Sequence, residues 1–152
     1  MKLYHFTAEE NLSSIEVCGL LSIPVLEKSG ISFTPNSDQN SRDIDRKKGL
    51  QNYVRLCRSP EHKMAKKVLN EQRVRKLVWL EVNNSVLDFP NTRFCKINAT
   101  TNGAEIEEDK FAFLNSEDTQ AEVLVYQQIP KSLITFPMHD SPTAVYQDKV
   151  PF

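Results

Sequence analysis

The stretch Gln120-Ala121-Glu122-Val123-Leu124-Val125-Tyr126 has the pattern of a strand that carries polar side chains beside a buried face. Side chains of a strand alternate between its two faces, so Ala121, Val123 and Val125 are expected to share the core face. Gln120 and Glu122 are then expected to point together to the other face. An amide and a carboxylate side by side at a strand start suit a ribose or a carboxamide. An ordinary exposed strand face has the same pattern and, from these residues alone, is the commoner case.

The rest of the chain predicts short strands and few helices. Thr7 and Glu10 form a capping box that predicts a helix ending at Gly19. Ser59-Pro60 predicts the start of a basic helix that reaches about Gln72. The polar segment 36–50 lacks periodicity and predicts a long functional loop. Strands mostly outnumber helices and do not alternate with them regularly, which predicts the α+β class. Further strands are expected at Lys2–Phe6, Ile31–Thr34, Asn52–Cys57, Lys76–Val82, Arg93–Ile97 and Ile134–Phe136.

Composition favours one folded domain. The chain has 152 residues, 39% of them hydrophobic and 26% charged, which excludes a disordered or collagen-like chain. We expect a single domain over 1–152, with a tail at 138–152 whose role is not assigned. No apolar run is long enough to span a membrane, and residues 1–20 lack a signal-peptide pattern. Three cysteines lie far apart in the sequence, which suits a reducing compartment, so we expect a cytoplasmic protein.

Charge is distributed unevenly along the chain. Between Arg42 and Lys76 there are twelve Lys/Arg and four Asp/Glu, so this segment carries +8 while the rest carries −9. Such asymmetry is typical of a surface that meets a polyanion such as nucleic acid. Two solvated faces that keep the protein soluble would give the same pattern.

Few residues fit the common catalytic patterns. His5, between Tyr4 and Phe6, can hold a ligand through a ring nitrogen, although a structural histidine is somewhat commoner. The spacing of His62 and His139 indicates no partner for either. Metal-binding patterns are absent from the sequence, so we expect no metal site. Four glycines, in no nucleotide-binding pattern, argue against a glycine-rich phosphate cradle.

An ordered set of short motifs spans residues 3–135. They are Leu3-Tyr4-His5-Phe6-Thr7, Asn11-Leu12-x-x-Ile15, Gly19-Leu20, Gly30-Ile31-Ser32-Phe33, Tyr53-Val54-x-Leu56 with Met64, Trp79-Leu80-Glu81-Val82, Phe94-Cys95-x-x-Asn98-Ala99, Gln120-Ala121-Glu122-Val123-Leu124-Val125, and Ile129-Pro130 with Ile134. Each motif alone is weak. In this order they resemble the DarT-type nucleic-acid ADP-ribosyltransferases.

This resemblance implies an ADP-ribosyltransferase fold, in which two small antiparallel sheets and a few short helices form a cleft that holds NAD⁺. It implies a toxin that uses NAD⁺ as substrate, needs no metal, and transfers ADP-ribose to a base, typically thymidine in single-stranded DNA. It also implies a macrodomain antitoxin as partner. We expect a monomer with no membrane partner.

By motif position, the resemblance makes Glu122 the catalytic glutamate. A loop arginine is expected to assist loss of the base proton; Arg42 is preferred over Arg46, although the loop does not align uniquely. The expected cofactor contacts are His5, Thr7, Asn11, Tyr53 and Gln120. The expected nucleic-acid contacts are Arg46, Lys47 and Lys48.

Two alternatives remain open on the sequence. One keeps the transferase activity but makes RNA or a protein side chain the acceptor. The other is a catalytically silent nucleic-acid-binding module on the same scaffold. Neither the acceptor base nor its sequence context follows from the sequence.

Overall fold

The computed structural model describes residues 1–35, 39–71 and 76–137, with only the backbone for 39–42. The tail 138–152 singled out above lies outside the described residues. The strands are β1 (Leu3–Ala8), β2 (Leu20–Leu21), β3 (Tyr53–Cys57), β4 (Leu77–Val82), β5 (Arg93–Cys95), β6 (Glu122–Tyr126), β7 (Gln128–Ile129) and β8 (Ile134–Thr135). The helices are α1 (Leu12–Cys18), α2 (Ile23–Lys28), α3 (Gln39–Lys48), α4 (Lys63–Asn70) and α5 (Lys110–Leu114).

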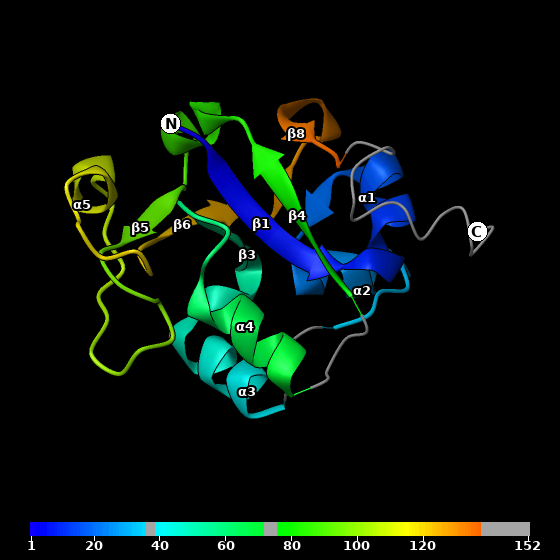
Figure 1. Cartoon of the computed structure of the whole chain (residues 1–152), viewed down its shortest axis with the longest axis horizontal. Coiled ribbons are helices and arrows are strands. Elements are labelled where there is room, and N and C mark those ends of the chain that lie inside the picture. The colour runs from blue at the N-terminus through cyan, green and yellow to red at the C-terminus, as the bar shows by residue number, and fades with distance from the viewer. Residues whose placement is uncertain (36–38, 72–75, 138–152) are drawn as a thin grey trace.

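Two antiparallel sheets form the framework, as the α+β prediction requires. The larger sheet has the strand order β5-β6-β3-β1-β4-β8, and the smaller one pairs β2 with β7. Strand β1 pairs with β4 along its whole length, from Leu3 to Ala8. With β3, in the described part of the chain, it pairs only at Tyr4 and Cys57. The larger sheet therefore consists of two three-stranded halves that meet at one point and then part (Figure 1).

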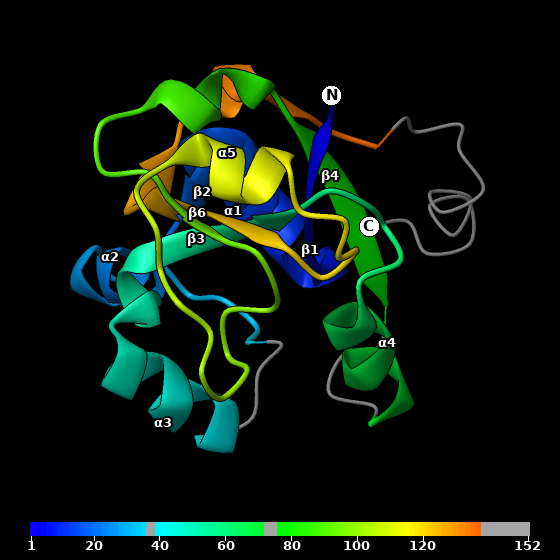
Figure 2. The same ribbon diagram turned by 90° about the vertical axis from the view of Figure 1, so that its left-hand side faces the viewer.

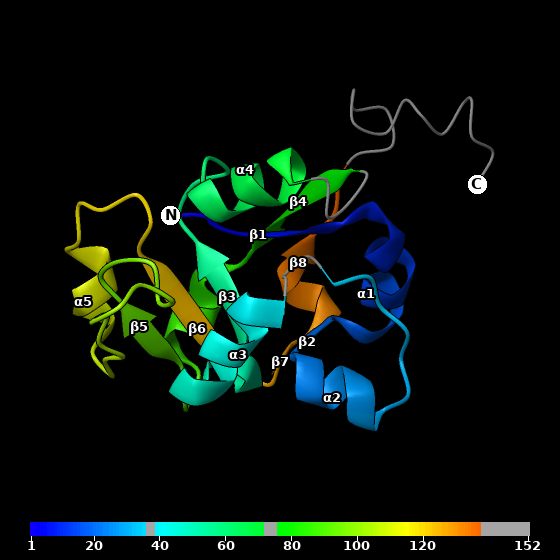
Figure 3. The same ribbon diagram turned by 90° about the horizontal axis from the view of Figure 1, so that it is seen from below.

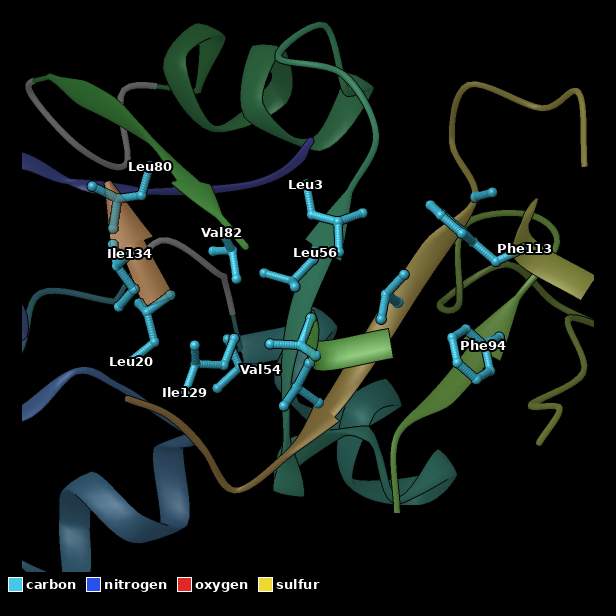
Figure 4. Close-up of a cluster of buried hydrophobic side chains, with 14 of the residues drawn as sticks. Leu3, Leu20, Val54, Leu56, Leu80, Val82, Phe94, Phe113, Ile129 and Ile134 are labelled. Carbon is cyan, nitrogen blue, oxygen red and sulfur yellow. The ribbon is translucent and has the colours of Figure 1, made fainter. Parts of the chain in front are cut away.

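The larger hydrophobic cluster lies on one face of these strands (Figure 4), and a smaller one around Leu124 lies on the other. Ala121, Val123 and Val125 are buried together in the larger cluster, so the predicted alternation of this stretch is confirmed. Val54 and Leu56 of β3 join the same cluster. Because alternate residues of a strand face opposite ways, the other face of β3 and β6 is left to carry different side chains.

The helices are short and lie around the sheet. Helices α1 and α2 lie with β2 and β7 at one end of the molecule, and α5 lies beside β5 at the other (Figure 3). Helices α3 and α4 both lie below the sheet in the view of Figure 2. Within the described residues, no helix has the length and apolar character needed to cross a membrane.

Gly19 ends α1, as its position predicted. Its N–H donates to the Ile15 carbonyl, and its φ of 78° lies in the region that favours glycine. A Cβ at this position would overlap the carbonyl oxygen of Ile129, so the close approach of β7 also requires glycine here.

Four local predictions are wrong. Residues Ile31–Thr34, predicted as a strand, form none, and the backbone of Thr34 is instead bound by the Asn11 side chain. The segment predicted as a long loop contains α3, which ends before Gly49 at φ 75°. Thr7 does not cap a helix but lies inside β1, because its strand pairs with Val78 of β4. Helix α4 begins at Lys63 rather than near Pro60, and His62 is its N-cap. In each case a contact with a distant segment overrides the local signal.

Candidate active site

A cavity of about 210 Å³ opens where β1 and β3 part. We call it the β1–β3 cavity. Its lining comes from β1, α1, α2, α3, β3, α4 and the start of β6, so segments far apart in sequence meet there. Five of the residues predicted from the sequence line it: His5, Thr7, Asn11, Tyr53 and Glu122.

Glu122 is a buried carboxylate whose two oxygens differ in their surroundings. The residue is only 5% exposed and begins β6, between β3 and β5. Its Oε1 accepts hydrogen bonds from Arg55 Nη2 at 2.6 Å and from the Ala99 N–H at 2.7 Å. Its Oε2 accepts no hydrogen bond from the described residues, and His62 Nε2 lies 3.7 Å away. One oxygen is thus anchored while the other is left for a ligand.

Arg55 holds this carboxylate from the neighbouring strand. Glu122 lies opposite Cys57 on β3 and Arg55 lies opposite Leu124, so Arg55 reaches Glu122 diagonally across one face of the sheet. Its guanidinium also binds Asp45 Oδ1 of α3 at 3.2 Å and Asn98 Oδ1 at 3.1 Å. Although burial acts to lower it, the Glu122 charge and hydrogen bond raise the pKa of Arg55, so the guanidinium stays charged.

His5 and Tyr53 reach the cavity from β1 and β3. The Nδ1 atom of His5 lies 2.9 Å from the backbone carbonyl of Arg55. A carbonyl only accepts, so Nδ1 carries the proton and, in the neutral ring, Nε2 is left as an acceptor. Tyr53 packs edge-on against Tyr126, with ring centroids 5.5 Å apart. Both side chains lie where a ligand in the cavity would meet them.

Thr7 and Asn11 line the cavity but are tied to each other. Asn11 Nδ2 donates to Thr7 Oγ1 at 3.0 Å and to the carbonyl of Thr34 at 2.9 Å. Asn11 Oδ1 accepts the Thr34 N–H at 2.7 Å. The amide therefore fixes the segment before α3 against β1 and shapes the wall of the cavity.

Gln120 is placed differently from the prediction. Strand β6 begins at Glu122, so Gln120 precedes the strand and is not among the described residues that line the β1–β3 cavity. Its Oε1 accepts the N–H of Lys63 at 2.9 Å, at the start of α4. Gln120 and Glu122 are therefore not side by side, because alternation applies only within the strand.

The predicted basic residues lie on α3. The side chain of Arg42 falls outside the described residues. Arg46 is exposed, forms an ion pair with Asp43 at 3.4 Å, and does not line the cavity among the described residues. Lys47 is exposed. Lys48 Nζ donates to the carbonyls of Ala99 and Thr101, at 2.9 and 2.6 Å, so it fastens that loop to α3.

Other catalytic chemistries find little support at this site. Burial raises the pKa of the Cys57 thiol to about 12, so it is not a thiolate nucleophile at neutral pH. Within residues 1–35, 39–71 and 76–137 there is no group of three or more His, Cys, Asp or Glu side chains placed to hold a metal ion.

Most of the chain matches a known protein family. The sequence profile of DarT, described as ssDNA thymidine ADP-ribosyltransferase, matches residues 4–116. The chain belongs to the DarT family. That match ends before Glu122, whose place in the site rests on the geometry above. Among curated proteins, none matches the chain significantly.

Solved DarT structures share the fold of the chain. Thermosipho africanus DarTG, in complex with ADP-ribose, is 19% identical with a TM-score of 0.77; the alignment covers 98% of this chain and 46% of that one. The chain thus spans about half the length of that protein. Thermus sp. 2.9 DarT with ADP-ribosylated ssDNA is 15% identical, with a TM-score of 0.70 and coverage of 99% and 85%. The same DarT with NAD⁺ is 18% identical, with a TM-score of 0.61 and coverage of 99% and 87%.

In this DarT-family chain, the sequence did not predict four residues of the site around Glu122: Arg55, Asp45, Asn98 and His62. A signal for Arg55 was present, because a charged residue between Val54 and Leu56 must face away from the core, as Glu122 does. Asp45 lies in the segment predicted as a loop. His62 has no sequence signal, since only the fold brings it near Glu122.

The buried histidines predict a dependence of stability on pH. Burial lowers the pKa of His5 and His62 below the usual 6.5. The unfolded chain therefore binds protons near pH 6.5 while the folded chain does not, and the free energy of unfolding falls as pH drops below 6.5. Each histidine contributes a slope of up to about 1.4 kcal/mol per pH unit. Urea denaturation at pH 7.5, 6.5 and 5.5 measures this loss.

His62→Asn is the matched variant for this measurement. Its loss of stability between pH 6.5 and 5.5 should be smaller than that of the wild-type protein. The raised pKa of Asp45 acts in the opposite sense at lower pH, but Asp45 is present in both proteins and cancels in the comparison. Equal slopes in the two proteins would refute the assignment of a neutral buried His62.

Proposed function

We propose that this DarT-family chain transfers ADP-ribose from NAD⁺ to thymidine in single-stranded DNA, with release of nicotinamide. The observation that supports this proposal most directly is the buried Glu122 at the β1–β3 cavity. Its Oε1 accepts hydrogen bonds from Arg55 and Ala99, and its Oε2 accepts none from the described residues. The family description and the shared fold support the same activity.

Glu122 supplies the chemistry expected of this site. Its Oε2 accepts a hydrogen bond from a hydroxyl of the nicotinamide ribose, and its charge stabilises the positive charge that develops on that ribose. Because Oε1 is held by two donors, Arg55 and the Ala99 N–H restrain the carboxylate before the substrate arrives. His5 Nε2 and Tyr53 contact the same substrate within the cavity.

The transfer balances as a substitution at the ribose. The bond between the ribose carbon and the nicotinamide nitrogen breaks, and nicotinamide leaves with the electron pair. A bond forms from the same carbon to a ring nitrogen of the base, which gives up its proton to solvent water. An arginine beside the base stabilises the negative charge that this loss creates.

We propose Arg42 for that role over Arg46. Position 42 lies one turn before Asp45 on α3, and Asp45 lines the cavity and binds Arg55. Arg46 pairs with Asp43 and is not among the described residues that line the cavity, which supports the choice of Arg42.

The two basic helices are the proposed site of nucleic-acid contacts. We propose that Arg46 and Lys47 of α3, together with Lys63, Lys66 and Lys67 of α4, which are all exposed, supply positive charge suited to a phosphate backbone. We propose Lys48 as an indirect contributor, through the loop that it holds. A macrodomain antitoxin as partner, the monomeric state and a cytoplasmic location belong to the same proposal.

Intact-mass measurement of short oligonucleotides tests this function. The protein and NAD⁺ are incubated with single-stranded DNA that contains thymidine, the same strand with every thymidine replaced by cytidine, duplex DNA and RNA. A gain of one ADP-ribose is expected only on the single strand that contains thymidine. NAD⁺ consumption is followed in parallel.

The other outcomes separate the alternatives. Modification of RNA alone would show that the acceptor is RNA. Consumption of NAD⁺ with no modified oligonucleotide would point to a protein acceptor. Binding of DNA without any consumption of NAD⁺ would overturn the enzymatic proposal in favour of a silent binding module.

A further inference from the structure

His62 is a buried histidine beside the catalytic carboxylate. It is 1% exposed, belongs to the lining of the β1–β3 cavity, and is the N-cap of α4. Its Nδ1 accepts the N–H of Met64 at 3.2 Å. Its Nε2 makes no hydrogen bond with the described residues and lies 3.7 Å from Glu122 Oε2.

The helix cap decides which ring nitrogen carries the proton. A nitrogen that accepts a backbone N–H is unprotonated, so in the neutral ring the proton is on Nε2. The lowered pKa of His62 keeps the ring neutral at pH 7. Nε2 is therefore a donor that faces the one Glu122 oxygen without a hydrogen bond.

A buried donor without a hydrogen bond costs free energy of folding, and His62 Nε2 is such a donor beside Glu122 Oε2. Rotation about the terminal bond of a glutamate is soft and moves both carboxylate oxygens together, so a donor beside Oε2 adds to the restraint that Arg55 and the Ala99 N–H exert through Oε1. His62 Nε2 lies 3.7 Å from Oε2, on the side of the carboxylate that the hydrogen bonds to Oε1 do not occupy.

We infer that His62 is a positioning residue for Glu122, whose Nε2–H sets the orientation of Oε2 for the ribose hydroxyl. The inference rests on the proposed function and adds a residue that acts through Glu122. The competing explanation is that His62 only caps α4. The two explanations differ in which ring nitrogen matters.

Two substitutions separate the ring nitrogens. His62→Asn retains an acceptor near the position of Nδ1 and so keeps the cap, but removes the donor that faces Glu122. His62→Gln places an amide N–H near the position of Nε2 and weakens the cap. We expect His62→Asn to lower kcat by about ten-fold with little change in KM for NAD⁺, and His62→Gln to retain most of kcat.

An NMR titration tests the contact independently of activity. The chain has three histidines, and the spectrum of His62→Asn identifies the signal of His62. Besides burial, the groups that act on the pKa of His62 are Glu122, the Gln120 backbone and Asp118, which raise it, and Arg55, which lowers it. Removing the Glu122 charge by Glu122→Gln should therefore lower the pKa of His62 further.

The outcomes distinguish this inference from the proposed function. If the wild-type protein neither modifies an acceptor nor consumes NAD⁺, the proposed function fails, and the titration still decides whether His62 and Glu122 interact. Equal losses of kcat in His62→Asn and His62→Gln, or no loss in either, would refute the positioning role. An unchanged His62 pKa in Glu122→Gln would refute the contact itself.

Discussion

Replacing Glu122 by glutamine is expected to lower ADP-ribosyl transfer by about 100-fold to 1000-fold, because removing a group that stabilises transition-state charge has an effect of this size. The neutral amide retains an oxygen that accepts from Arg55 and from the Ala99 N–H, so the anchoring contacts survive. What is lost is the negative charge that faces the developing positive charge on the ribose. Single-turnover rates with NAD⁺ and a DNA strand that contains thymidine measure the change.

Binding and folding are the controls for this prediction. The circular dichroism spectrum should match that of the wild-type protein, and NAD⁺ should still bind, because the walls of the cavity are unchanged. A variant that transfers ADP-ribose at more than about a tenth of the wild-type rate would remove Glu122 from the chemistry, since that loss is too small for a charge-stabilising group.

The sequence predicts correctly what depends on neighbouring residues and fails where a distant segment decides the structure. Period-two alternation correctly assigned Ala121, Val123 and Val125 to the core, since it depends only on neighbouring residues. The same rule failed for Gln120, because the strand starts two residues later and the turn before it caps α4. Where an element ends depends on its partners, which a local pattern does not contain.

Long-range contacts also explain what the sequence missed in the site. Helix α3 has a polar sequence without a strong apolar stripe, and two of its residues are fastened from elsewhere, Asp45 by Arg55 and Lys48 by the loop at Ala99. The local sequence of residues 36–50 therefore predicts a loop. His62 and Glu122 are sixty positions apart and meet only because β3 and β6 pair. The resemblance to the family predicted Glu122 as a site residue, but it did not predict Asp45 or His62.

Replacing Arg55 by methionine is expected to destabilise the protein by about 3–5 kcal/mol, because it leaves buried carboxylates without their countercharge. The Glu122 side chain is 6% exposed and that of Asp45 is 19% exposed, so water replaces the guanidinium poorly. Methionine has a similar volume and no charge, which confines the change to electrostatics and hydrogen bonding. Urea denaturation at pH 7 measures the difference in unfolding free energy.

Two further variants identify the cause. Arg46→Met removes an exposed arginine that also pairs with an aspartate, and it should cost only about 0–1 kcal/mol. In the Glu122→Gln background, Arg55→Met should cost clearly less than in the wild-type protein, because one of the two buried charges is already gone. If Arg55→Met costs no more than Arg46→Met, or costs the same in both backgrounds, Arg55 does not hold the Glu122 carboxylate. The anchoring of Oε1, on which the proposed catalytic role of Glu122 depends, would then need another source than β3.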